Sequence, residues 1–139
     1  MSQPVGQSDP VQAMLATDEA SRMFGIEVLD YGDGWARGQM TVRDDMVNGH
    51  GICHGGMIFS VADTAFACAC NSWGPVTVAA ECDILFVAPA RLGDVLTAEA
   101  RMRSRFGRGG LYDLVSEREP PIIGAAVDWA AQVKIMTPR

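Results

Sequence analysis

The sequence predicts an α+β fold in which a curved antiparallel β-sheet wraps around one long central helix. Residues 55–71 are apolar over the length of a helix and leave no polar face, which is typical of a buried helix. Several other stretches alternate between apolar and polar side chains, as strands of a half-covered antiparallel sheet do. They are residues 36–43, 76–86, 96–102 and 123–135. Strands and helices do not alternate along the chain, so a parallel sheet is not expected.

The N-terminal region is predicted to hold a flexible leader and one additional helix. Residues 1–8 are polar and contain a proline and a glycine, which is typical of a disordered end. Asp9 followed by Pro10 predicts a helix start, with Gln12 at the capping-box position. We expect this helix to run to about Phe24 and to pack on the outside of the domain.

The strands are predicted to place small and aliphatic side chains against the central helix. Gly32-Asp-Gly34 indicates a tight turn between two strands, of which the second begins near Ala36. On the next strand we expect an inward face of Val76, Val78, Ala80, Cys82, Ile84 and Phe86. Leu96, Ala98, Ala100 and Met102 are expected to face inward on the following strand. After a break at Pro120-Pro121, the last strand is expected to span residues 123–135.

Composition limits the function classes. At 139 residues the chain suits one domain, which we place at residues 9–139. A net charge of −6 argues against nucleic acid or an anionic membrane as the main partner. No apolar stretch reaches the ~18 residues of a membrane span, and the N-terminus does not resemble a signal peptide. A cytoplasmic location is therefore expected.

The cysteines and the clustered arginines are possible sites. Cys53, Cys68, Cys70 and Cys82 form no C-x-x-C pair and have no histidine placed to complete a zinc site, so no metal is expected. Cys53 adjoins both histidines and is a minor candidate nucleophile. The basic residues Arg101, Arg103, Arg105 and Arg108 lie close together in the sequence. The favoured interpretation is a solvated strand face, and the alternative is a contact with nucleotide phosphates.

One carboxylate stands out on the central helix. Asp63 is the only formally charged side chain between Asp45 and Glu81, and it falls within the apolar helix. An unpaired carboxylate in such surroundings costs free energy or has a raised pKa, so we expect it to be retained for function. Asp63 is therefore a candidate base or nucleophile.

The helix start is a candidate oxyanion site. His54-Gly55-Gly56 leads straight into the helix, whose first N–H groups are free and carry the positive end of the dipole. Gly55 is therefore a candidate oxyanion donor. Eight residues of helix separate Gly55 from Asp63, which is about 12 Å at 1.5 Å per residue. Two antiparallel helices related by a two-fold axis would bring Gly55 of one subunit opposite Asp63 of the other, so this chemistry predicts a dimer.

The same residues resemble those of the hotdog-fold acyl-CoA thioesterases, and among them the phenylacetate-degradation (PaaI-type) thioesterases. The matching words are Asn48-Gly-His, Cys53-His-Gly-Gly and Phe59-Ser-x-Ala-Asp-Thr-Ala-Phe-Ala-x-Ala-Cys-Asn-Ser72. A weaker resemblance continues through Pro89 and Gly93-Asp94 to Leu111-Tyr-Asp113. Relatives often carry a basic residue just before that proline, whereas this chain has Phe86-Val-Ala-Pro89, so its contacts with coenzyme A phosphates are expected to differ.

The resemblance implies a hotdog fold that hydrolyses acyl-CoA thioesters at the interface of a homodimer, or of a dimer of dimers (a tetramer). It implies Asp63 as nucleophile or general base, Gly55 as oxyanion donor, and Asn48 and His54 in the same site. No cofactor is expected, because coenzyme A is part of the substrate. Further substrate contacts are expected from His50, Gly56, Ser60, Thr64, Arg105 and Arg108.

Several of these residues also have structural interpretations. Asn48 is in an Asn-Gly pair, which is common in turns, and His50 is suited to ordering that loop. His54 is suited to capping the helix. Ser60 and Thr64 either bond Asp63 or a water, or bond back to their own helix.

The resemblance favours phenylacetyl-CoA or hydroxylated phenylacetyl-CoA as substrate, with a role in phenylacetate catabolism. Other aryl or medium-chain acyl-CoA esters stay open. Two further functions remain as alternatives: a hotdog-fold dehydratase or hydratase of acyl thioesters, and a non-catalytic acyl-CoA binding protein. Thiol release from an acyl-CoA ester separates the thioesterase from both.

Overall fold

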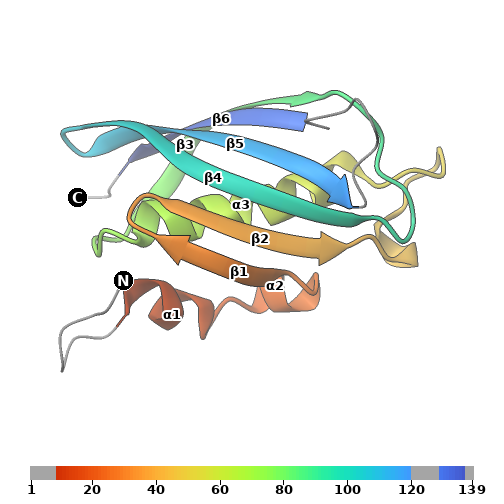
Figure 1. The fold of residues 1–139 in the computed structure, drawn as a ribbon, viewed down its shortest axis with the longest axis horizontal. Helices are drawn as coiled ribbons and strands as arrows, with labels where there is room; N and C mark the ends of the chain where they lie inside the picture. Colours follow the sequence, from red (N-terminus) through yellow and green to blue (C-terminus); the bar gives the residue numbers. More distant parts are fainter. Residues whose placement is uncertain (1–8, 120–128, 137–139) are drawn as a thin grey trace.

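The structure, a computed structural model, describes residues 9–119 and 129–136, with side chains as far as Val115. The described strands form one six-stranded antiparallel sheet that curves across a long helix (Figure 1). The predicted leader at residues 1–8 lies outside the described residues. So do Pro120-Pro121 and the first part, 123–128, of the predicted last strand.

The sheet has the strand order β1-β2-β4-β5-β6-β3. Every neighbouring pair is antiparallel. The β1–β2 hairpin turns through Asp33 and Gly34, as predicted, and Gly34 takes a left-handed φ of 73°. The strands are β1 (Glu27–Gly32), β2 (Trp35–Thr41), β3 (Val78–Phe86), β4 (Val95–Phe106), β5 (Gly109–Glu119) and β6 (Trp129–Met136).

Helix α3 (Gly55–Asn71) is the predicted central helix, and it packs on the concave face of the sheet (Figure 1). The contact is made by small side chains, which let helix and sheet approach closely. On the helix these are Ala62, Ala65 and Ala69, and on the sheet they are Ala36, Ala98 and Ala100, all fully buried. Phe66 and Tyr112 pack edge to face beside them, with ring centroids 5.6 Å apart. The α+β class with a wrapped central helix is therefore confirmed.

The N-terminal helix was predicted as one element, which is wrong. It is divided into α1 (Pro10–Leu15) and α2 (Glu19–Met23). The division occurs because Asp18 starts a new helix: its Oδ1 accepts from the Ser21 N–H at 3.0 Å and its Oδ2 from the Ser21 hydroxyl at 2.6 Å. A short 3₁₀ turn (Asp44–Met46) was also not predicted.

The start of α1 follows the prediction only in part. Asp9 caps the helix, since its Oδ1 accepts from the Val11 N–H at 2.9 Å. The side chain of Gln12 does not bond back to the cap and instead donates to the Tyr31 hydroxyl at 3.1 Å. Tyr31 in turn donates to the Asp9 carboxylate. These bonds fasten α1 to strand β1.

The predicted inward face of β3 is also wrong for the single chain. The strand begins at Val78, and Val78 and Phe86 are 50% and 46% exposed. Among that predicted face, Ile84 is half-buried and packs at the margin of the core. The reason is position: β3 is at the edge of the described sheet, paired with β6 and largely beyond the reach of α3.

The predicted faces of the strands that became β2 and β4 agree with the structure over the length covered by α3. Ala36, Met40 and Val42 are buried, and so are Leu96, Ala98 and Ala100. Met102, which was predicted to face inward, is 37% exposed because β4 continues past the central helix.

The small residues under α3 are expected to be essential for stability. Ala98→Leu would force three extra carbon atoms between sheet and helix, and overpacking of this kind costs about 1–3 kcal/mol. We expect a lower urea midpoint than for Ala20→Leu, in which the same change is made on the exposed face of α2. Equal midpoints for the two variants would contradict this account of the packing.

Candidate active site

Helix α3 has one solvent-exposed stripe, formed by Gly56, Asp63 and Ala67. The sequence had predicted a helix buried on all sides. Gly56 and Asp63 are exposed and Ala67 is half-exposed, while the remaining faces are mostly buried. Their spacing of seven and then four residues places them in one line along the helix. The sheet and the N-terminal helices cover the other sides. The stripe is therefore the surface on which α3 can meet a substrate or another subunit.

Asp63 lies on this stripe in a mostly apolar hollow of about 700 Å³. Although the residue is open to solvent in the single chain, the atoms packed around it desolvate the carboxylate and raise its pKa. The negative charge of Asp18 raises the pKa further. A carboxyl group of raised pKa is better suited to accept a proton near neutral pH than an ordinary aspartate.

Gly55 lies at the start of α3 beside a second hollow of about 490 Å³. The N–H of Gly56 is already used, because it donates to Nδ1 of His54 at 3.0 Å. The N–H of Gly55, by contrast, makes no hydrogen bond to the described part of the chain. A free N–H at the positive end of a helix dipole can bind an oxygen that carries negative charge.

The close fit at Gly55 adds a steric requirement. A Cβ atom at this position would lie 3.1 Å from Cζ of Phe86, which lines the same hollow. Any side chain larger than hydrogen would therefore press on Phe86 or fill the hollow. The glycine keeps the hollow open next to the free N–H.

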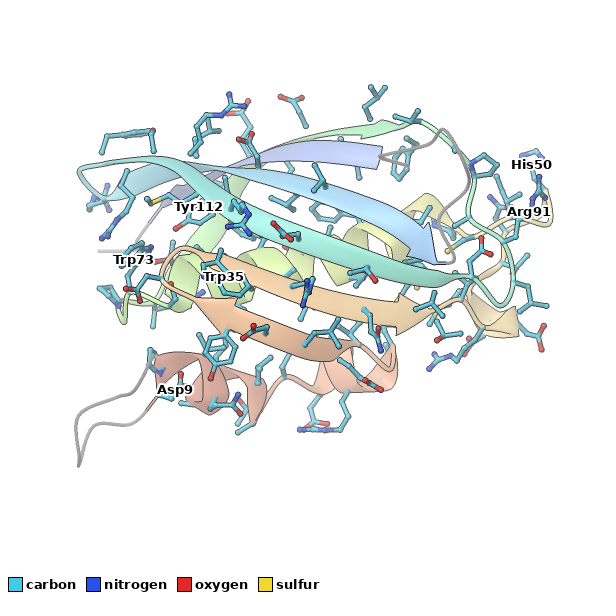
Figure 2. The ribbon with its side chains drawn as sticks, viewed as in Figure 1. Asp9, Trp35, His50, Trp73, Arg91 and Tyr112 are labelled. Carbon is cyan, nitrogen blue, oxygen red and sulfur yellow. The ribbon has the colours of Figure 1, made fainter. Side chains whose placement is uncertain are left out.

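Asn48 also lines the Gly55 hollow and orders the loop before it. Its Oδ1 accepts from the N–H groups of His50 at 2.9 Å and Ile52 at 3.3 Å. The segment between β3 and β4 also holds this loop, because the Cys53 N–H donates to the Ala90 carbonyl at 2.7 Å. His50 is exposed, at the same end of the molecule as Arg91 (Figure 2).

His54 has the capping role that was one of its two interpretations. It is the N-cap of α3, and its ring accepts from the second N–H of the helix. This bond fixes the orientation of the imidazole beside Gly55. The ring's Nε2 is the nitrogen left for a contact with a bound molecule.

The structure places Ser60 and Thr64 in helix contacts. The Ser60 hydroxyl donates to the Gly56 carbonyl at 2.7 Å, which is the bond back to its own helix. Thr64 is buried, with its hydroxyl 2.7 Å from that of Ser21 on α2. The second bond ties α2 to α3 at the residue next to Asp63.

The arginines are far from the Gly55 hollow within one chain. The guanidinium of Arg105 lies 4.3 Å from the ring centroid of Trp73, and Figure 2 shows Trp73 and His50 at opposite ends of the molecule. Arg101 lies over Trp35 at 5.5 Å, and Arg103 pairs with Asp113 at 2.8 Å. Arg101, Arg103 and Arg105 are exposed on β4, as expected for a solvated strand face, and Arg108 is exposed in the turn that follows.

The chemistry of Cys53 argues against a nucleophile at that position. The side chain is buried, and burial raises the pKa of its thiol to about 11. A thiol with this pKa stays protonated at neutral pH and is a poor nucleophile. In the described part of the chain, no three histidine, cysteine, aspartate or glutamate side chains converge as they would around a metal ion.

Sequence reasoning missed Asp18, which connects α2 to the site. Its carboxylate bonds Ser21, and Ser21 bonds Thr64, the residue next to Asp63. The available signal was the Asp18-Glu-Ala-Ser21 spacing, in which an aspartate precedes by three residues a serine whose N–H it can cap. A single predicted helix across this region concealed it.

The two halves of the candidate site occupy separate hollows in one chain. Asp63 lines one, with Asn71 at its far end, and Gly55 lines the other, with Asn48. Their separation along α3 is about 12 Å, as the helix rise requires. A single small reactive group cannot contact both within one chain.

Comparisons with known proteins agree with this fold. The family model described as Thioesterase superfamily matches residues 50–114, which include Gly55 and Asp63. Acyl-coenzyme A thioesterase PaaI of Escherichia coli K12 is 46% identical over 102 residues, 73% of each chain. The structure of the E. coli PaaI protein from the phenylacetic acid degradation operon superimposes with a TM-score of 0.87 at 37% identity, over 94% of this chain and 91% of that one.

A mutant of the phenylacetic acid degradation protein PaaI from Thermus thermophilus is a further structural relative. It superimposes with a TM-score of 0.80 at 27% identity, and the match covers 87% of this chain and 100% of that chain. The chain therefore belongs to the thioesterase superfamily, with a hotdog fold of the PaaI type, and is a thioester hydrolase. No helix in the described residues is long and apolar enough to cross a lipid bilayer.

The raised pKa of Asp63 has a consequence for stability. Below about pH 3.8 the carboxyl group is protonated in both the folded and the unfolded chain, so it costs nothing. As the pH rises through the higher pKa of the folded state, the desolvated charge forms and destabilises the fold. We therefore expect Asp63→Asn to have a higher Tm than wild type at about pH 7, and this difference to fade towards about pH 3.5.

Asp33→Asn, in the exposed β1–β2 turn, is the matched control for this comparison. The measurement is thermal unfolding followed by circular dichroism at both pH values. A Tm of Asp63→Asn at or below that of wild type at neutral pH would show that the charge is not destabilising.

Proposed function

We propose that this chain hydrolyses acyl-CoA thioesters to free acid and coenzyme A, with phenylacetyl-CoA or hydroxylated phenylacetyl-CoA as its favoured substrates, in phenylacetate catabolism. One observation carries the proposal: the free N–H of Gly55 and the desolvated carboxylate of Asp63 are on one helix. They supply an electrophilic donor and a base or nucleophile, the two groups that thioester hydrolysis needs. The PaaI-type relatives support the choice of acyl group.

The reaction follows from the two groups. The Gly55 N–H donates to the thioester carbonyl oxygen and stabilises the negative charge that develops on it. Asp63 from the partner subunit either attacks the carbonyl carbon or removes a proton from an attacking water. Direct attack forms a mixed anhydride on Asp63, which water then hydrolyses to the free acid. In both routes the carbon–sulfur bond breaks, and the leaving thiolate takes up a proton to give coenzyme A. Asn48 positions the water or the carboxylate, and His54 contacts the carbonyl or the leaving sulfur through Nε2.

The functional unit in this proposal is a homodimer, and a dimer of dimers is its larger assembly. Strand β3 supports it, because its outer edge is unpaired within the described sheet and such edges associate readily. Large apolar side chains are exposed along and just beyond this strand, as at a subunit interface: Val78, Leu85, Phe86 and Val87. Two-fold pairing there would let the Gly55 hollow of one subunit meet the Asp63 hollow of the other.

In the proposed dimer, arginines that contact coenzyme A bound at one Gly55 hollow would come from the opposite subunit. Arg105 and Arg108 are near the β4–β5 turn, at the far end of the sheet from His50 (Figures 1 and 2). With antiparallel helices, that end of one subunit approaches the Gly55 end of the other. Contacts of Arg105 or Arg108 with coenzyme A phosphates would therefore come from the partner.

Loss of the Asp63 carboxylate should remove activity without unfolding the protein. We expect Asp63→Asn to reduce kcat for thiol release from phenylacetyl-CoA by about 10²–10⁴-fold, the usual contribution of a positioned acid–base group. Asp33→Asn should retain the wild-type rate. Wild-type activity in Asp63→Asn would refute the assigned role. Tight ester binding by the wild type without thiol release would instead indicate a non-catalytic binder.

The pH profile tests whether the reaction needs the ionised carboxylate of Asp63, which a general base and a nucleophile both require. Asp63 must be deprotonated in either role, so kcat should fall as the pH drops through its pKa, which burial raises from the ordinary value of 3.8. A kcat that stays constant down to about pH 4 would count against both roles.

Mixing two inactive variants tests whether the site is shared between subunits. Asp63→Asn and Gly55→Val should each be inactive. Refolded together, half of the dimers are mixed and each holds one intact Gly55–Asp63 pair, so about a quarter of the wild-type activity should return. If both groups act within one chain, every site in a mixed dimer carries a defect and no activity returns.

A further inference from the structure

Helix α2 is joined to α3 by a buried chain of hydrogen bonds that reaches the residue next to Asp63, and no step of the reaction above uses this chain. We propose that Asp18 is a positioning residue for thioester hydrolysis, because it holds α2 against α3 through Ser21 and Thr64 and keeps a negative charge beside Asp63. The inference rests on the proposed function and adds a residue to it. Asp18 and Ser21 precede residues 50–114, the part of the chain that the family model matches.

The direction of each hydrogen bond in this chain follows from the groups that make it. A carboxylate only accepts, so the Ser21 hydroxyl donates its single proton to Oδ2 of Asp18 at 2.6 Å. In the 2.7 Å contact between Ser21 and Thr64, the Thr64 hydroxyl must then be the donor. The Thr64 proton is used for this contact with α2, and it is therefore not available to the carboxylate of Asp63.

The chain is shielded from water. Ser21 and Thr64 are 8% and 7% exposed, and Asp18 is half-buried. A buried hydrogen bond is costly to break, because each partner is then left unsatisfied away from water. The other end of α2 is held as well, since the Arg43 guanidinium donates to the Met23 carbonyl at 3.0 Å. Asp18 is thereby kept at a fixed place next to the solvent-exposed stripe of α3.

The groups around Asp63 leave Asp18 as the charge that acts on it among the described residues. Burial first, and then the negative charge of Asp18, raise the pKa of Asp63. The side chains that α1 places at the same hollow carry no charge. The thiols of Cys70 on α3 and Cys82 on β3 are close enough to feel the charge of Asp63, but burial raises the pKa of both, to about 12 for Cys70, so they are neutral at neutral pH. A carboxylate of raised pKa is the stronger base.

The first test removes the charge of Asp18 and keeps the chain of hydrogen bonds. In Asp18→Asn the amide oxygen still accepts from the Ser21 N–H, and the amide nitrogen donates to the Ser21 hydroxyl, which turns to donate to Thr64. Without the negative charge the pKa of Asp63 falls, so the acid limb of the kcat profile for phenylacetyl-CoA should move to lower pH. Glu19→Gln removes one charge from an exposed side chain of the same helix and should leave the limb in place. A limb that moves equally in both variants, or in neither, would overturn the inference.

The second test cuts the chain and keeps the charge. Ser21→Ala removes the hydroxyl that joins Asp18 to Thr64. We expect kcat to fall by about 10-fold at the plateau of the pH profile, because a small displacement of a catalytic group reduces the rate by up to about 100-fold. Ser104→Ala, on the exposed part of β4, is the matched control and should keep the wild-type kcat. A lower Tm of Ser21→Ala with an unchanged kcat would show that the chain serves stability alone, and would refute the positioning role.

Direct titration of Asp63 separates failure of this inference from failure of the proposed function. The carboxyl carbon of Asp63, labelled with carbon-13 and assigned by its loss in Asp63→Asn, reports protonation by NMR without any catalysis. A lower titration midpoint in Asp18→Asn than in wild type and Glu19→Gln, in a protein that releases no thiol from acyl-CoA esters, would refute the proposed reaction and uphold the action of Asp18 on Asp63. Equal midpoints in the three proteins would overturn the inference whatever the activity.

Discussion

The close packing of α3 on the sheet is the constraint from which the site follows. Alanines on both surfaces allow the contact, and they are fully buried between helix and sheet. Gly55 and Asp63 are thereby fixed about 12 Å apart on one rigid element. Because neither group can move towards the other, their cooperation on one carbonyl needs a second copy of the helix.

Two features of the surroundings of α3 are unfavourable for the stability of a single chain. The sheet and the N-terminal helices cover most of α3 but leave the Gly56–Asp63–Ala67 stripe open. A charge at Asp63 is disfavoured there by desolvation and by the nearby carboxylate of Asp18. The apolar side chains of β3 are likewise uncovered in the single chain. Both features are unfavourable for an isolated domain, and both are accounted for by the shared active site proposed above.

The sequence predicted those features that depend on neighbours along the chain. The Asp9 cap, the turn at Gly34 and the extent of α3 were recognised from local patterns, and the structure confirms them. The importance of Asp63 was inferred from the absence of other charges around it. The family resemblance was recognised because its residues cluster in one continuous stretch around Gly55. The roles assigned to the individual site residues stay predictions.

The tertiary structure decided which surface covers each element, and sequence periodicity carries no such information. Alternation along β3 was real, but the strand is at the sheet edge, so its predicted inner face is open. The break before α2 depends on the hydrogen bonds that the Asp18 carboxylate accepts from Ser21. These bonds compete with continuation of α1, and helix propensity alone does not show which of the two prevails. The separation of Gly55 and Asp63 into two hollows likewise depends on α1 and the β3 segment, which approach α3 only in the folded chain.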